Sequence, residues 1–306
     1  MKKFISFLLF FLGLLFVLLL KGNSIGNAIG DTSYVGSETC KGCHEPYFLG
    51  FQKSVHGKKA IPNSPGNRDG CESCHGPGAQ HVEKGGGKGV GLLVFGRKTD
   101  ARAKDSKCLA CHEVSKDMPF WDLSRHKTMG VSCVDCHSIH SAGAKKNMLK
   151  VAEPDLCFGC HKRVRAQTNK QSHHPIREGR MKCNDCHNPH GSFDIKMMIK
   201  ADSVNELCYK CHAEKRGPFA FEHPPVPENC LICHQAHGSN HSYLLDKKTP
   251  QLCQSCHNVA FHQTYPFNKQ DTFRGTAPFF KAGLVARSCR NCHTNIHGSN
   301  RDLFFR

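Results

Sequence analysis

The stretch CNDCHNPHGS, Cys183–Ser192, joins the pentapeptide CxxCH to a second histidine three residues further on. The pentapeptide occurs ten times along the 306 residues, and its ten copies contain all twenty cysteines. CxxCH is the attachment signature of a c-type haem: the two cysteines form thioethers, and the histidine is an axial ligand of the iron. The repeat therefore predicts ten covalently bound haem c groups.

Each copy supplies three predicted site residues. The predicted thioether cysteines are Cys40, Cys43, Cys71, Cys74, Cys108, Cys111, Cys133, Cys136, Cys157, Cys160, Cys183, Cys186, Cys208, Cys211, Cys230, Cys233, Cys253, Cys256, Cys289 and Cys292. The predicted proximal ligands are His44, His75, His112, His137, His161, His187, His212, His234, His257 and His293. Zinc knuckles and disulfide frameworks also use many cysteines, but neither explains a histidine directly after every second cysteine.

The N-terminus indicates export. Two lysines precede an apolar run from Phe4 to Leu20, and Ala28 and Gly30 fit the small-residue rule for signal cleavage. We expect residues 1–30 to be a signal peptide. An uncleaved N-terminal anchor remains the alternative, because the run is long and Lys21 follows it directly. No cysteine lies before Cys40, so a lipid anchor is not expected.

Export suits the chemistry, since bacterial haem is ligated to CxxCH outside the inner membrane. We therefore expect a periplasmic protein, and the cytochrome domain is predicted to cover residues 31–306. That leaves about 28 residues per haem, too few for an ordinary apolar core around each porphyrin. The predicted fold is mainly α with much irregular structure, extended, with short helices carrying the motifs and the haems as its core.

The formal charge of +17 would also fit a nucleic-acid partner. Ten haems, however, bring about twenty propionates, and the lysines and arginines can be understood as partners for them. No nucleic-acid binding is predicted.

The motifs alternate between two kinds. First motifs follow a turn and an apolar residue, as in EPDLCFGCH and VNELCYKCH, and second motifs continue to another histidine, as in CVDCHSIH and CLICHQAHGS. One of each defines a two-haem module. The first motifs of the five modules are 68, 49, 51 and 45 residues apart, and the modules are predicted near residues 37–100, 101–150, 151–200, 201–246 and 247–306. Because repeat units pack on their neighbours, we expect the five modules in a line.

Twelve histidines lie outside the motifs, and each module holds one between its motifs and one after its second motif. The predicted distal ligands are His56, His81, His126, His140, His173, His190, His223, His237, His262 and His297. His174 is an equal alternative to His173, and His241 is left over. Filling both axial positions leaves no open iron and favours low reduction potentials.

A histidine three residues after the proximal one reaches at most about 11 Å, barely enough to pass around its own porphyrin. The second histidine is therefore predicted to serve another haem, most simply the other haem of its module. His81 and His297 depart from the three-residue spacing.

Ten CxxCH motifs in an exported chain of this length, with the CxxCHxxHGS form, resemble the MtrA/DmsE family of decahaem c-type cytochromes from about Ser37 onwards. The resemblance implies a low-potential haem wire for anaerobic respiration. The wire would either be threaded through an outer-membrane β-barrel porin for extracellular electron transfer, or lie in the periplasm as a carrier to a terminal reductase. The implied partners are the porin, other multihaem cytochromes and a redox donor from the inner membrane or periplasm.

Two other classes remain open. Multihaem nitrite reductases typically carry a CxxCK motif, which is absent from this sequence, so an enzyme is not expected; were there an open haem, the one assigned to His81 would be the candidate. An extracellular haem filament is the third reading. Outside the repeat, Glu83–Gly91 is predicted to be a flexible loop, and the aromatic stretch Tyr265–Phe280 a lid on terminal haems or a docking surface.

Overall fold

The computed structural model describes residues 33–116, 118–140, 146–257 and 288–306. The predicted signal or anchor, His262 and the stretch Tyr265–Phe280 lie outside the described residues. The chain divides into two compact units, of which unit 1 comprises Met1–Phe48 and Val55–Val94, and unit 2 comprises Leu49–Ser54 and Phe95–Arg306. Each unit is described by itself.

Unit 1 is built from short helices. Helix α2 (Ser37–Lys53) carries the first motif and enters unit 2 with its last residues. It has a kink at His44 (φ −118°, ψ 37°), two residues before Pro46, whose missing N–H and ring interrupt the helical hydrogen bonds. The other helical elements of unit 1 are η1 (Val55–Gly57), η2 (Pro65–Asn67), α3 (Glu72–His75) and α4 (Ala79–Glu83).

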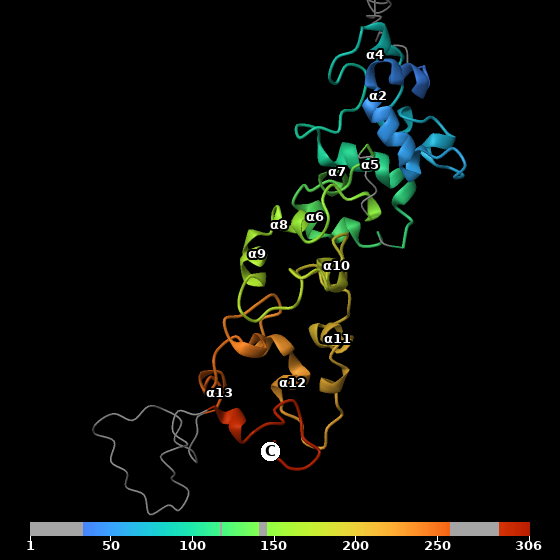
Figure 1. Ribbon diagram of the computed structural model, residues 1–306. Coiled ribbons are helices and arrows are strands. Elements are labelled where there is room, and N and C mark those ends of the chain that lie inside the picture. The colour runs from blue at the N-terminus through green and yellow to red at the C-terminus, as the bar shows by residue number, and fades with distance from the viewer. Residues whose placement is uncertain (1–32, 117, 141–145, 258–287) are drawn as a thin grey trace, which may run out of the picture. The chain divides into compact units, whose positions relative to one another are not determined.

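Unit 2 continues with short helices, from α5 to α13, and α7 lies beside α5 (Figure 1). Its α-helices are α5 (Ala101–His112), α6 (Arg125–Thr128), α7 (Cys133–Cys136), α8 (Asp155–Phe158), α9 (Lys162–Thr168), α10 (Cys183–Cys186), α11 (Val204–Tyr209), α12 (Pro225–Glu228) and α13 (Gln251–Gln254). Its 3-10 helices are η3 (Trp121–Leu123), η4 (Lys146–Met148), η5 (Ala213–Lys215), η6 (Cys230–Ile232), η7 (Ser242–Leu244) and η9 (Cys289–Asn291).

Polar side chains start the helices that carry motifs. Asp100 caps α5 by accepting a hydrogen bond from the Ala103 N–H at 3.1 Å. At α7 the carboxylate of Asp135, a residue inside the motif CVDCH, accepts the Ser132 N–H at 2.8 Å. At α7 and α10 the two motif cysteines begin and end a single helical turn, which brings them to one face as predicted from their spacing. Helices α8, α11 and α13 contain only the first cysteine of their motif.

Strand pairing in the described residues is limited to isolated bridges. Three of them fold the segment after a second motif back onto its proximal histidine: His137 pairs with Leu149, His187 with Ile199, and His234 with Leu245. Two others join consecutive modules, through the pairs Ser172–Ser239 and Phe221–Ser299. The mainly helical and irregular fold predicted from the sequence is confirmed.

The apolar core is small. Among the described residues the buried hydrophobic side chains are Phe48, Phe51, Trp121, Phe158 and Ile199. Five side chains cannot supply the core of a chain of this size, which supports the expectation that prosthetic groups take its place. Across the same described ranges, no helix is both long and apolar enough to cross a bilayer.

The glycine of the HGS sequence lets consecutive modules approach closely. Gly191 and Gly238 have positive φ angles of 108° and 153°, and a Cβ on either would fall on a carbonyl oxygen of the preceding module, that of Phe120 or Gln167. Gly298 has a φ angle of 147°, and a Cβ on it would collide with the ring of Phe219 in the preceding module. A side chain at these positions would push the modules apart.

We predict that Gly191→Ala destabilises the holoprotein more than Gly179→Ala. Both glycines have positive φ, but a Cβ at Gly179 meets nothing within 4 Å. Overpacking costs about 1–3 kcal/mol, so the additional loss in Gly191→Ala should be several degrees of melting temperature, measured by calorimetry. Equal melting temperatures would show that the close approach is unimportant.

Candidate haem-ligand sites

Within each module, a polar side chain just before the first motif holds the start of the second motif. Asp105, three residues before Cys108, accepts the backbone N–H of Cys133 at 2.9 Å, and Asn205, three residues before Cys208, accepts that of Cys230 at 2.7 Å. Ser37 likewise accepts the Cys71 N–H at 3.0 Å, and Glu153 accepts the N–H of Asn184, the residue after Cys183, at 3.1 Å. In the last module the hydroxyl groups of Thr249 and Ser288 share a hydrogen bond of 2.8 Å. These side chains fix the two motifs of a module against each other.

The first cysteines of the two motifs consequently come together. A hydrogen bond with Cys208 lowers the pKa of the Cys230 thiol to about 7, and the Cys183 thiol raises the pKa of Cys157. The sulfurs of Cys157 and Cys183 and a Glu153 oxygen lie within 4.8 Å of one another. Three donors are one fewer than a structural zinc site uses, and both cysteines are needed for haem attachment.

Histidine rings face one another in pairs throughout the described residues. Every pair combines one CxxCH histidine with one histidine outside the motifs, and the ring centroids are 5.9 to 6.4 Å apart. The seven pairs are His44–His81, His126–His161, His137–His190, His174–His212, His187–His237, His223–His257 and His234–His297.

The spacing of the rings fits a metal ion between them. A metal–imidazole bond is about 2 Å long and the ring centroid lies about 1 Å behind the nitrogen, so two axial imidazoles place their centroids about 6 Å apart. Aromatic pairs also occur at such distances. Ordinary ring packing, however, would not select a CxxCH histidine in every pair. The residues present therefore fit haem c with two axial histidines.

The partner of the second histidine differs from the simplest expectation. His190 faces His137, the proximal histidine of the preceding module, with ring centroids 6.1 Å apart. His237 and His297 likewise face His187 and His234. The within-module pairing predicted for these histidines is wrong, because the close approach at the HGS glycine carries the ring across to the neighbouring module.

His81 is the exception. Its ring lies 6.2 Å from that of His44, the first proximal histidine of its own module. His81 differs from the other second histidines both in its six-residue spacing from His75 and in facing a ring of its own module. The haem assigned to His81 was the candidate for an open iron, but His81 has a facing imidazole like the other distal histidines.

The proximal histidines of second motifs share a hydrogen bond to a backbone carbonyl. His187 Nδ1 donates to the Met197 carbonyl at 2.8 Å. The same contact joins His75 to Leu93, His137 to Asn147, His234 to Tyr243 and His293 to Phe304, at 2.5 to 2.9 Å. A ring that donates from Nδ1 keeps the lone pair of Nε2 for a metal, as metal-binding histidines in proteins do.

The histidines between the motifs are held by the next module. His126 Nδ1 donates to the carbonyl of Pro189 at 2.9 Å, and His174 Nδ1 to that of Ala236 at 2.7 Å. These carbonyls directly precede His190 and His237, which face other proximal histidines. One contact therefore positions the ligands of two different sites.

The structure distinguishes the adjacent histidines His173 and His174. His174 faces His212 with ring centroids 6.4 Å apart. His173 donates from Nδ1 to the Lys170 carbonyl at 2.6 Å and from Nε2 to Glu178 Oε1 at 3.1 Å, and this second hydrogen bond lowers the pKa of Glu178. The geometry therefore favours His174 over His173 as the ligand.

Burial keeps several of the facing rings neutral, as metal ligation requires. It lowers the pKa of His297 to about 4, and it lowers the pKa values of His161, His223, His234 and His237 as well. The predictions for His56, His112 and His140 stay predictions.

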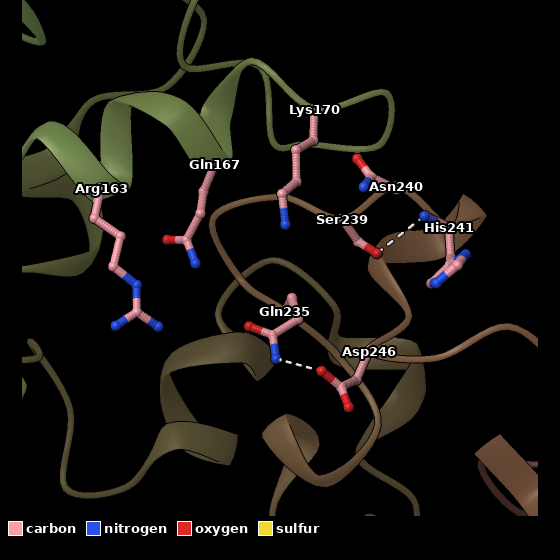
Figure 2. A pocket seen from close by; sticks show the side chains of 8 residues that line it. All are labelled: Arg163, Gln167, Lys170, Gln235, Ser239, Asn240, His241 and Asp246. Atoms are coloured by element: carbon pink, nitrogen blue, oxygen red, sulfur yellow. Dashed lines mark hydrogen bonds between the residues drawn. The ribbon is translucent and has the colours of Figure 1, made fainter. Parts of the chain in front are cut away.

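The surplus His241 lies in an open polar pocket (Figure 2). Arg163, Gln167 and Lys170 approach from one side, while the Gln235 side chain donates to Asp246 on the other at 2.7 Å. This lining is typical of a solvated charged surface.

The sequence interpretation missed two groups of residues. The clamping residues Ser37, Asp105 and Asn205 share a position three residues before a first motif, and this repeated polar position is a usable signal. The carbonyl acceptors have no signal of their own, because every residue has a carbonyl group.

Two families match parts of the chain. The doubled CXXCH motif family matches residues 126–166, 173–217 and 223–261, and the cytochrome c554 and c-prime family matches residues 94–138.

Several known cytochromes are similar to the chain. Multiheme cytochrome MtrA of Shewanella baltica (strain OS185) is 40% identical over 278 residues, which cover 89% of this chain and 81% of the relative. C-type polyheme cytochrome OmcB of Geobacter sulfurreducens (strain ATCC 51573 / DSM 12127 / PCA) is 30% identical over 135 residues, 40% of this chain and 16% of the relative. OmcC of the same strain is 30% identical over 102 residues, 30% of this chain and 12% of the relative.

The haem-attachment motifs, the facing imidazoles and the largely irregular helical fold define a multihaem c-type cytochrome, a class of protein that transfers electrons. The 40% identity to Multiheme cytochrome MtrA, over most of both sequences, also identifies the family within this class. The chain belongs to the family of Multiheme cytochrome MtrA.

We predict that His174→Ala converts one haem from low-spin to high-spin, because it removes the imidazole that faces His212. His173→Ala is the matched control in the neighbouring position and should leave every haem low-spin. EPR and visible spectra of the two purified holoproteins decide the assignment. A high-spin signal in His173→Ala alone would reverse it.

Proposed function

We propose that the chain is a wire of ten haem c groups, each held between two histidines, in five two-haem modules. The observation that carries this proposal is the series of facing imidazoles, six of whose seven pairs join consecutive modules. The distal ligands in the proposal are those predicted from the sequence, with His174 in place of His173.

Bound at these sites, haem c would supply a reversible one-electron Fe(III)/Fe(II) couple at low potential. The protein's part is to hold the order and spacing of the sites. The paired imidazoles would hold each haem iron from both sides and so would exclude a substrate from it. The clamps at Asp105 and Asn205 fix the sites within modules, and the cross-module histidines fix them between modules.

We further propose that residues 1–30 direct export or anchor the chain, and that residues 31–306 work in the periplasm in association with the outer membrane. There the chain would conduct electrons through a β-barrel porin toward other multihaem cytochromes, in extracellular electron transfer. Similarity to MtrA over 81% of that relative supports this assignment. A free periplasmic carrier that feeds a terminal reductase is the alternative function.

The haem number can be measured directly. Intact mass and the pyridine haemochrome assay of the exported protein should both give ten haems per chain, because all twenty cysteines lie in CxxCH motifs. A variant with Cys183 and Cys186 replaced by alanine should carry nine. Fewer than ten haems in the native protein would contradict the proposed wire of ten haem c groups.

The conduit is tested by extracting native membranes with a mild detergent and purifying the holoprotein through a C-terminal tag. A β-barrel protein should copurify in a fixed ratio, and the tag alone on an unrelated exported cytochrome is the control. Recovery of the haem protein only from the soluble periplasmic fraction, without a barrel, would instead establish the carrier function.

A further inference from the structure

We infer that the haem sites fall into two redox classes that alternate along the chain, with the second-motif sites at the lower potentials. The inference rests on the proposed function, because it requires the ten bis-histidine sites. The distinguishing feature is the hydrogen bond from the proximal imidazole to a backbone carbonyl.

All five second-motif histidines make this bond, from His75 to His293. Among the described residues, no first-motif histidine is seen to make it: His44, His161 and His257 have no ring-nitrogen hydrogen bond, and His212 has only a carboxylate, Glu214, at 3.9 Å. His112 has contacts that leave its class undecided. The difference therefore follows the type of motif.

The local fold explains the difference. After a second motif the chain turns back and pairs with the proximal histidine, so a carbonyl 9 to 11 residues further on reaches Nδ1 in the last four modules. After a first motif the chain continues into helix, α9 after His161 and η5 after His212. A helix keeps its carbonyls for its own hydrogen bonds and leads away from the ring.

The hydrogen bond has a defined electronic effect. Donation of the Nδ1 proton to a carbonyl makes Nε2 a stronger base and a better electron donor to iron. This stabilises the ferric state over the ferrous state, and hydrogen bonding around the axial ligands is one of the ways in which proteins set haem potentials. Second-motif sites should therefore be harder to reduce than first-motif sites.

Ring orientation provides a spectroscopic label for the sites. The second-motif pairs of modules two to four have interplanar angles of 28°, 29° and 11°. The two most twisted pairs, His126–His161 at 65° and His174–His212 at 47°, are first-motif sites. The first-motif pairs His44–His81 at 27° and His223–His257 at 19° are near-parallel, so only the twisted pairs identify their class. EPR of low-spin ferric haem separates near-parallel from strongly twisted axial imidazoles, so the strongly anisotropic signals mark first-motif sites.

At one second-motif site, a single side chain positions the carbonyl that accepts the histidine hydrogen bond. Asp194 Oδ1 accepts the backbone N–H groups of Lys196 at 3.0 Å and Met197 at 2.9 Å. It thereby holds the turn that presents the Met197 carbonyl to His187. Asp302 holds Phe304 in the same way at 2.8 Å, and Phe304 is the acceptor for His293. Asp194 is thus a positioning residue for the His187 site.

The test is EPR-monitored potentiometry of the holoprotein. As the potential is lowered, the strongly anisotropic signals should disappear before most of the near-parallel signals. In Asp194→Ala, one near-parallel signal should shift to a higher potential. Asp194→Asn is the matched control, because it removes the same charge but keeps an oxygen acceptor, so its signal should shift less than that of Asp194→Ala.

Each outcome decides between the proposals. Strongly anisotropic signals that disappear last, or identical potentials in Asp194→Ala and Asp194→Asn, would overturn the two classes while leaving the haem wire intact. High-spin signals in the wild type, or a count below ten haems, would instead contradict the bis-histidine wire. If Asp194→Ala loses haem, the order of disappearance in the wild type still decides the inference.

Discussion

Two imidazoles from different modules, held about 6 Å apart, are the arrangement on which the rest of this structure depends. His137 and His190 show the consequence, since neither module completes that site alone. The described apolar core consists of five side chains, far too few to define the packing of the modules by themselves. The facing imidazoles of neighbouring modules, with the haems proposed between them, therefore have to provide the specificity that a hydrophobic core provides elsewhere.

This constraint explains the tight backbone contacts between modules. A distal ring reaches the neighbouring site only if the chain beside it can touch the preceding module, and Gly191 and Gly238 allow that contact. The Pro189 and Ala236 carbonyls use the same approach to hold His126 and His174. A displacement of one ring would disturb a second site, so spacing is maintained cooperatively. Electron transfer benefits because distances between neighbouring sites stay constant.

The short helices and the small apolar core of the described residues could be predicted from the sequence, because the repeated CxxCH motif is a local signal and leaves few residues for each haem. The facing partners of the distal histidines could not be predicted from the sequence. The limited reach of His190 excluded its own haem, but two neighbouring haems were compatible with the same spacing. The choice depends on the contact of Gly191 with Phe120, 71 positions away in sequence. His173 and His174 were indistinguishable for a similar reason, since Glu178 occupies only one of them.

The first module shows how the repeat adapts where its pairing changes. His81 turns back to His44 instead of facing another module, and its longer spacing from His75 allows that path. The next module supplies the carbonyl acceptors for His126 and His174, whereas the glycine-rich segment Glu83–Gly91 supplies the acceptor for His81. The Val90 carbonyl accepts a hydrogen bond from His81 Nδ1 at 3.0 Å. Gly86, Gly87 and Gly89 adopt positive φ in this loop, which lets it curl around the ring. End units of repeat proteins commonly depart from the consensus in this way, because they must satisfy groups that internal units satisfy through a neighbour.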